Sequence, residues 1–267
     1  DTSFQKLFML IGPPRCGKGT VARVLAELVG KANAANPTLN SLSAMFGIET
    51  LIGKQLAVIS DARLSPKTDV GAVTENLLRI SGEDSVSVPR KYRQDFTAKL
   101  TSRFLILSNE VPGFVDQSGA LASRFVILKI TPSFLGREDL TLTQTLTAEL
   151  PGILLWSLEG LDRLRARGHF RQPSASAETV RQLYDLSSPI KAFVDDCCAL
   201  ENGAEVDGHA LYLAWCEWSV QQGREHPGTV QVFGRNLSSA FPHVRVSNRR
   251  QGGRRSRYYE GIKLIVS

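Results

Sequence analysis

The chain has 267 residues, which is enough for one large domain and a small one. Apolar residues make up 42% and charged residues 22%, as in soluble globular proteins, and no apolar run reaches the roughly 18–20 residues of a membrane span. The net charge is +6, and eight basic residues but one acid lie between Arg235 and Lys263. A polyanionic partner is therefore expected at this end, with a basic tail kept soluble by its charges as the alternative.

Short apolar runs alternate with helical patterns through the first two thirds of the chain. Buried strands are predicted at 6–11, 56–59, 104–107 and 125–128, and a helix begins near Thr20. Continuous apolar strands that alternate with helices predict an α/β fold with a mostly parallel sheet flanked by helices. We assign residues 1–170 to this first domain.

A long helix follows the last of these strands. Its apolar residues fall on one side, which predicts that they face the core, and Trp156 is expected beneath the sheet. The residues on this side are Ile153, Leu154, Leu158, Leu161 and Leu164.

The periodicity is broken by a segment rich in Gly, Pro and Ser, and we place a linker at 171–188. Beyond it, three helices are predicted at 189–200, 207–222 and 229–241, and two strands at 243–247 and 258–266. Three helices followed by a basic hairpin are typical of a winged helix, so 189–267 is predicted to be a small α+β domain of that kind. Trp215 and Trp218, three residues apart on a helix, are expected in its core.

The cysteines and histidines do not form a metal-binding pattern. Cys197 and Cys198 are adjacent, Cys16 and Cys216 stand apart, and the four histidines are scattered. Zinc chemistry is therefore not expected, and we predict free thiols in a reducing compartment. No leader pattern precedes the first strand, so we expect no signal peptide and interpret the chain as a piece of a longer polypeptide.

A phosphate-loop pattern, G-x-x-x-x-G-K, lies between the first predicted strand and the first predicted helix. It consists of Gly12, Pro13, Pro14, Arg15, Cys16, Gly17, Lys18, Gly19 and Thr20. Glycines let the backbone N–H groups point at phosphate oxygens, the helix dipole adds positive potential, and Lys18 reaches the terminal phosphates. The pattern in this context predicts nucleotide binding, with a fortuitous glycine-rich turn as the alternative.

The metal ligands of the expected Mg²⁺ are Thr20 and Asp61. Thr20 stands one place later than the usual hydroxyl ligand, although nucleotide kinases of the adenylate type share the sequence G-K-G-T. Asp61 ends the strand at 56–59, where a carboxylate holds Mg²⁺ in phosphate-loop enzymes. An exposed strand-end aspartate is the alternative. No second acid follows, and Glu83 and Glu110 are weak candidates for the residue that polarises the attacking water.

Five blocks in order resemble the superfamily 3 helicase domain of phage and plasmid primase-helicases, kin of the poxvirus-type enzymes. They are GPPRCGKGT, LIGKQLAVISDAR, ISGEDSVSVPRKYR, FLILSNEVP and SGALASRF, with the predicted winged helix after them. The resemblance implies a ring-forming ATPase of the AAA+ branch, expected to be a hexamer that unwinds DNA at a replication fork. It also implies a prophage or mobile element, the cytoplasm of a bacterial host, and a possible primase domain or other replication proteins as partners.

The resemblance assigns roles to single residues. Lys18 matches the phosphate-binding lysine, Asp61 the metal-side acid and Asn109 the polar sensor that orients water. Arg124 matches the arginine finger that reaches the neighbouring subunit's site, where a guanidinium suits the spread charge of the phosphoryl transition state. A turn-capping amide and a surface ion pair are the alternatives for Asn109 and Arg124.

Two basic segments are the expected DNA contacts. In the family, a hairpin at the position of Arg90, Lys91, Tyr92 and Arg93 grips single-stranded DNA, and these cations around one aromatic ring suit that task. In the C-terminal domain, helix 229–241 would enter a groove and the turn 248–257 would lie on the backbone. The arginines of this turn taken as DNA contacts are Arg249, Arg250, Arg254 and Arg255. Solvated basic turns, or a winged helix that binds protein, are the alternatives.

Three functions remain open on the sequence. The first is an ATP-hydrolysing helicase acting on single-stranded and forked DNA. The second is a nucleotide kinase, which G-K-G-T suggests but which lacks a recognisable lid. The third is a replication initiator or loader that binds ATP and hydrolyses it slowly, which the missing second acid favours.

Overall fold

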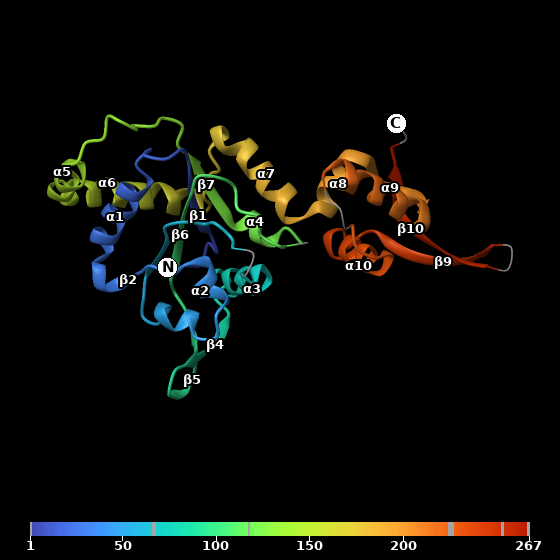
Figure 1. The fold of residues 1–267 in the computed structure, drawn as a ribbon, viewed down its shortest axis with the longest axis horizontal. Helices are drawn as coiled ribbons and strands as arrows, with labels where there is room; N and C mark the ends of the chain where they lie inside the picture. The colour runs from blue at the N-terminus through green and yellow to red at the C-terminus, as the bar shows by residue number, and fades with distance from the viewer. Residues whose placement is uncertain (1, 66–67, 117, 224–226, 252–253, 266–267) are drawn as a thin grey trace. The chain divides into compact units, whose positions relative to one another are not determined.

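The computed structural model describes residues 2–65, 68–116, 118–223, 227–251 and 254–265. The chain forms two compact units (Figure 1). The first unit comprises Asp1–Phe114 and Ala120–Leu183, and the second comprises Val115–Gly119 and Tyr184–Ser267. The second unit therefore includes a short segment from the middle of the sequence as well as the C-terminal part.

The first unit is built on a five-stranded sheet whose pairings are all parallel. In spatial order its strands are β2 (Ala34–Ala35), β3 (Leu56–Ile59), β6 (Arg103–Ser108), β1 (Leu7–Ile11) and β7 (Phe125–Lys129). The predicted parallel sheet and its four apolar strands are confirmed. The central strands are buried on both faces, as their continuous apolar sequences require, with Met9, Ile59 and Ile106 fully inaccessible to solvent.

Helices flank this sheet, and α1 packs on one face of it. Its residues Ala22, Leu25 and Val29 contact apolar side chains of β1, β3 and β6. The helices of the first unit are α1 (Lys18–Val29), α2 (Leu39–Ser43), α3 (Val70–Ser81), α4 (Ala120–Arg124), α5 (Leu142–Ala148) and α6 (Leu150–Arg167). Residues inside the predicted linker, 177–187, form helix α7 (Ala177–Ser187), and the change of unit falls within it.

Helix α6 corrects part of the core prediction. Leu164 is buried, but Leu154, Leu158 and Leu161 are exposed, and Trp156 is 67% exposed rather than packed beneath the sheet. The helical period correctly identified an apolar stripe along one side of the helix. It carries no information on whether the surface that covers such a stripe belongs to the same chain.

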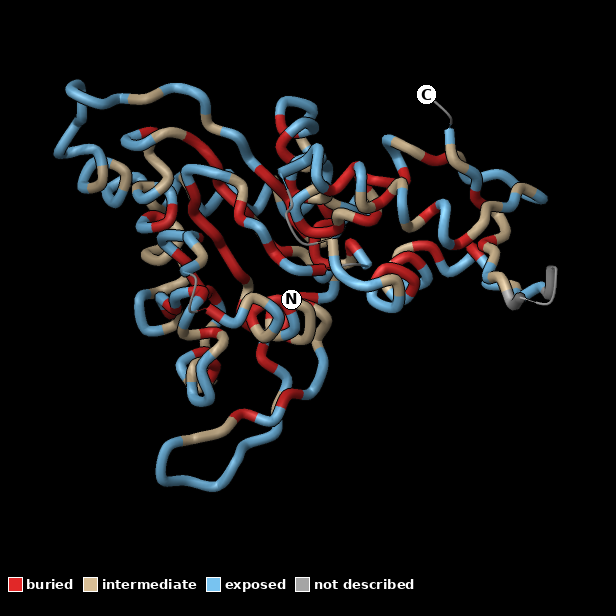
Figure 2. Tube along the Cα trace, turned by 45° about the vertical axis from the view of Figure 1, so that its right-hand side comes forward, coloured by how far each residue is buried: buried red, intermediate tan, exposed pale blue. Residues whose placement is uncertain are grey.

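A two-stranded antiparallel hairpin extends from the first unit. It consists of β4 (Ser85–Arg90) and β5 (Arg93–Lys99), so a hairpin is present at the position where the resemblance implied one. Val86 and Val88 are buried at its base, whereas β5 is exposed along nearly its whole length, as Figure 2 shows. The polar sequence RQDFTAK has no buried face, and a strand without one leaves no hydrophobic alternation to detect.

The second unit has the element order α8 (Pro189–Cys197), β8 (Cys198–Asp207), α9 (Gly208–Gln221), α10 (Val230–Ala240), β9 (Arg245–Gln251) and β10 (Arg254–Leu264). Its antiparallel sheet has the order β8-β10-β9. Trp215 and Trp218 are buried and pack against Phe193, which confirms the prediction that they form a core. Residues 198–200, predicted as the end of a helix, belong instead to β8.

Candidate functional site

The loop between β1 and α1 has backbone geometry that needs its glycines. A Cβ at Gly12 would lie 2.4 Å from the carbonyl oxygen of Ile130, so no larger residue fits there. Gly17, the residue before α1, has φ 93°, in the left-handed region that glycine adopts without strain. The loop therefore turns sharply enough to present the N–H groups at the start of α1, which is the arrangement that binds anions.

Lys18 and Asn109 are brought together at the end of the loop. The Lys18 ammonium donates to the carbonyl oxygens of Gly12 and Pro13 at 2.6 and 2.9 Å, and to Asn109 Oδ1 at 3.0 Å. Asn109 follows β6, which pairs directly with β1. Two residues 91 positions apart thus meet because the carboxyl ends of neighbouring parallel strands share one edge of the sheet.

Asp61 follows β3, the other neighbour of β6, at the same edge. Its carboxylate accepts from Arg63, whose Nε lies 3.0 Å from Oδ2 and whose backbone N–H lies 3.2 Å from Oδ1. These hydrogen bonds lower the pKa of the Asp61 carboxyl below its ordinary value, so the group is ionised at neutral pH. More than half of the side chain remains exposed.

The oxygen atoms available for Mg²⁺ are few. Thr20 Oγ1 accepts a hydrogen bond from Arg23 at 3.0 Å. Among the described residues, no group of three or more His, Cys, Asp or Glu side chains could enclose a metal ion. One ionised carboxylate and one hydroxyl fit the way proteins bind Mg²⁺, which keeps much of its shell as water and substrate phosphate.

The two weak candidates for the missing acid lie at opposite edges of the sheet. Glu83 accepts from the Thr2 hydroxyl, and its charge partly offsets the burial that lowers the pKa of Arg103, the first residue of β6. Glu110 directly follows Asn109, and its charge acts on Arg63. Glu110 is therefore the candidate on the edge that carries Lys18 and Asp61.

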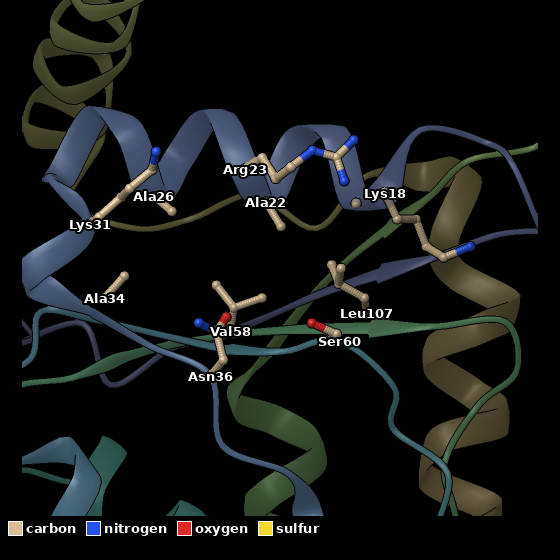
Figure 3. Close-up of a pocket in the computed structure, with 11 residues that line it drawn as sticks. Lys18, Ala22, Arg23, Ala26, Lys31, Ala34, Asn36, Val58, Ser60 and Leu107 are labelled. Carbon is tan, nitrogen blue, oxygen red and sulfur yellow. The ribbon is translucent and has the colours of Figure 1, made fainter. Parts of the chain in front are cut away.

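A cavity of about 570 Å³ extends from Lys18 along α1 (Figure 3). Its walls are small or apolar, with Ala22 and Ala26 on the helix and Val58 and Leu107 on the sheet. Its polar lining includes Arg23, Lys31, Asn36 and Ser60, which the sequence had not singled out. One signal was available, because Gly19, Ala22, Arg23 and Ala26 recur at the spacing of one helical face.

Arg124 is not brought to this edge. It ends α4 immediately before β7, and Phe125 pairs with Leu7 at the start of β1, so Arg124 lies at the amino edge of the sheet. Its guanidinium donates to the carbonyl oxygen of Leu78 and, at 2.8 Å, to Ser81 Oγ, both on α3.

The tip of the β4–β5 hairpin gathers three cations around two aromatic rings. Arg90 donates to the carbonyl oxygen of Gln94 at 2.8 Å, and its guanidinium lies 5.4 Å from the centre of the Phe96 ring. The Lys91 ammonium lies 5.1 Å from the centre of the Tyr92 ring, and Tyr92 is 93% exposed. Arg93 is exposed beside them.

In the second unit, Arg249 is held by acids. It donates to the two carboxylate oxygens of Glu205 at 3.1 and 2.6 Å, and Glu260 lies 3.5 Å away. Its guanidinium also lies 5.2 Å from the centre of the Tyr258 ring. The side chains of Arg250, Arg254 and Arg255, the other predicted DNA contacts of this turn, lie outside the described residues.

Residues 10–124 match a protein family described as a family of unknown function, DUF5906. The match runs from β1 to the end of α4. It thus contains Lys18, Asp61, Asn109 and Arg124.

Solved structures of the NrS-1 C-terminal region share the fold across 97% of this chain. One, an apo structure of the NrS-1 C-terminal region, has a TM-score of 0.56 at 13% identity and covers 97% of this chain and 67% of that one. Another form of that region has a TM-score of 0.52 at 14% identity with the same coverage. A structure of JCV helicase has a TM-score of 0.42 at 17% identity and covers 68% of this chain and 50% of that one. No helix in the described ranges is long and apolar enough to cross a membrane.

Proposed function

We propose that this chain is the ATP-driven motor module of a replicative DNA helicase of superfamily 3, working as a ring. The observation that carries the proposal is the contact between Lys18 and Asn109, 3.0 Å apart at the carboxyl edge of the parallel sheet. A phosphate-binding lysine beside a polar side chain on the neighbouring strand is the arrangement that phosphoryl transfer to water requires. The fold shared with the NrS-1 C-terminal region over 97% of the chain is consistent with this function.

In the proposed reaction, the loop and the start of α1 bind the phosphates, and Lys18 contacts the terminal ones. Asp61 and Thr20 would hold Mg²⁺, which neutralises the charge that develops on the phosphate oxygens. Asn109 orients the attacking water. Glu110 supplies the carboxylate at this edge that accepts the proton of that water, in the role left open by the single acid after β3.

Arg124 is proposed to complete the site of a neighbouring subunit. Its position at the amino edge, away from Lys18, is the position that a residue acting in trans needs. Such arginine fingers raise the rate of phosphoryl transfer by about 10³–10⁵-fold. An assembly with ATP sites between subunits, as a hexameric ring provides, follows from this assignment.

DNA would be bound by both units. In the first, Lys91 offers a charge for phosphates and Tyr92 a face on which a base can stack. In the second, the order of three helices and three strands supports a winged helix, in which α10 would be the helix presented to DNA. The exposure of Tyr92 makes the β4–β5 hairpin the stronger of the two candidates.

An ATP-dependent loader that hydrolyses slowly is a second candidate. The observation that favours it is the Asp61–Arg63 pair, because the acid just after β3 already receives a guanidinium at 2.9 Å. Binding of ATP without DNA-dependent turnover would select this alternative.

The first test is steady-state ATP hydrolysis by the wild type and by Lys18→Ala, together with the mass of the assembly formed with ATP. We expect a multi-subunit assembly, and turnover that Lys18→Ala abolishes. Arg124→Ala should bind ATP without hydrolysing it, and added Lys18→Ala subunits, which still carry Arg124, should partly restore turnover. Normal turnover by Lys18→Ala, or no restoration in the mixture, would contradict the proposal.

A further inference from the structure

The last turn of α3 receives a charged side chain from a distant part of the sequence. Nη1 of Arg124 donates to the carbonyl oxygen of Leu78 and, at 2.8 Å, to the buried hydroxyl of Ser81. The Leu78 carbonyl also accepts the backbone N–H of Gly82 at 2.8 Å. The final carbonyls of a helix have no partners within it and carry the negative end of its dipole, so a guanidinium stabilises this turn.

This turn leads into the β4–β5 hairpin with little intervening chain. Three residues connect α3 to Ser85, and their backbone is tied back to the helix, with the Asp84 N–H 3.0 Å from the carbonyl oxygen of Arg79. Glu83, between them, has φ 63°, which a non-glycine residue adopts only when its surroundings hold it there. The buried Val86 and Val88 then fix the base of the hairpin. A change in the last turn of α3 is therefore passed to the hairpin.

Glycine at position 82 leaves room for this arrangement. A Cβ there would lie 2.9 Å from the Leu78 carbonyl oxygen and 3.2 Å from Nη1 of Arg124. An alanine would thus press on the Leu78 carbonyl and shift the guanidinium by a few tenths of an ångström without removing it.

We propose that Arg124 also acts within its own chain, as the positioning residue that anchors the C-terminus of α3 and with it the DNA-binding hairpin. The inference rests on the proposed function, because its consequence depends on Arg124 reaching a neighbouring ATP site. Nη1 of this guanidinium already serves two acceptors on α3, and we infer that binding a neighbour's phosphate draws the side chain away from them. Engagement in trans therefore releases α3 and changes the hairpin in the subunit that donates the finger.

Hydrogen–deuterium exchange of the full chain tests this, with and without Mg²⁺ and a non-hydrolysable ATP analogue. In the wild type, the analogue should speed amide exchange across residues 78–90 by roughly two- to fivefold, the effect of a lost charge–dipole contact at a helix end. Arg124→Ala should show that faster exchange without nucleotide and gain nothing more from the analogue. Gly82→Ala should also show it without nucleotide, although it keeps the arginine.

Ser81→Ala is the matched control. It removes one of the two acceptors but leaves the finger intact, so it should retain most of the response to the analogue and hydrolyse ATP within about twofold of the wild type. Protection of residues 12–29 by the analogue reports nucleotide binding separately. Unchanged or slower exchange at 78–90 in a protein whose residues 12–29 are protected would overturn the inference alone. Absence of protection at 12–29 would instead overturn the proposed function.

Discussion

The two basic hairpins of this chain present their charge differently. In β4–β5, the ammonium of Lys91 contacts an aromatic ring, and none of Arg90, Lys91 and Arg93 forms an ion pair within the described part of the chain. In β9–β10, Arg249 is bound by Glu205 and Glu260. The number of basic residues in a segment therefore does not give the charge that a polyanion meets.

The difference follows from the neighbouring strand. Among the residues that the structure describes, no third strand pairs with the β4–β5 hairpin, and β5 stays exposed. The β9–β10 hairpin pairs with β8, whose sequence LENGAE brings Glu201 beside Lys263 and Glu205 opposite Glu260. Two carboxylates directly opposite each other repel, and Arg249 between them relieves that repulsion. Arg249 is thus engaged in holding the sheet together.

Removing the exposed pair at the tip of β4–β5 should have the largest effect on DNA binding. Lys91→Ala/Tyr92→Ala should weaken binding of a single-stranded oligonucleotide by roughly 5- to 150-fold, since a stacked base is worth about 1–3 kcal/mol. Fluorescence anisotropy of a labelled oligonucleotide measures it. Arg249→Ala is the comparison variant, and an equal loss in both variants would remove the distinction between the hairpins.

The salt dependence of binding separates charge from stacking. Lys91→Ala should reduce the slope of log K against log salt for single-stranded DNA by about 0.7, the share of one phosphate contact. Tyr92→Ala should lower the affinity and leave the slope unchanged. Titrations at several salt concentrations give both quantities, and a reduced slope for Tyr92→Ala would show that the ring does not act by stacking.

The smallest expected effect comes from freeing the second hairpin. Glu205→Gln removes the closer carboxylate from Arg249, and binding of duplex DNA should then tighten by up to about fivefold, in line with the modest energy of an exposed ion pair. Glu201→Gln, which frees Lys263 instead, is the matched control on the same strand. Unchanged duplex binding by Glu205→Gln would place the DNA away from this face.

The sequence predicted the features that are encoded by short local patterns. The apolar strands at 56–59 and 104–107, the loop around Lys18 and the buried pair Trp215 and Trp218 are local patterns with one physical meaning. The resemblance assigned Lys18 and Asn109 separately, and the structure adds that they meet, because parallel neighbouring strands end at one edge.

The features that the sequence did not predict depend on tertiary contacts, which a local pattern does not specify. Trp156 and Leu154 look like core because periodicity marks an apolar face without naming what covers it. The strand β8 was missed because LENGAE has neither a strand's alternation nor a helix's period. The attachment of Arg249 to Glu205 depends on the register between β8 and β10, which spans more than forty residues of sequence.

The most direct test of the account is steady-state ATP hydrolysis with and without single-stranded DNA, in the wild type, Lys91→Ala/Tyr92→Ala and Arg249→Ala. We expect DNA to stimulate hydrolysis by the wild type and by Arg249→Ala, and the hairpin variant to lose this stimulation. Stimulation that persists in Lys91→Ala/Tyr92→Ala, or hydrolysis by the wild type that DNA does not change, would contradict a motor whose ATP hydrolysis depends on DNA bound at the β4–β5 hairpin.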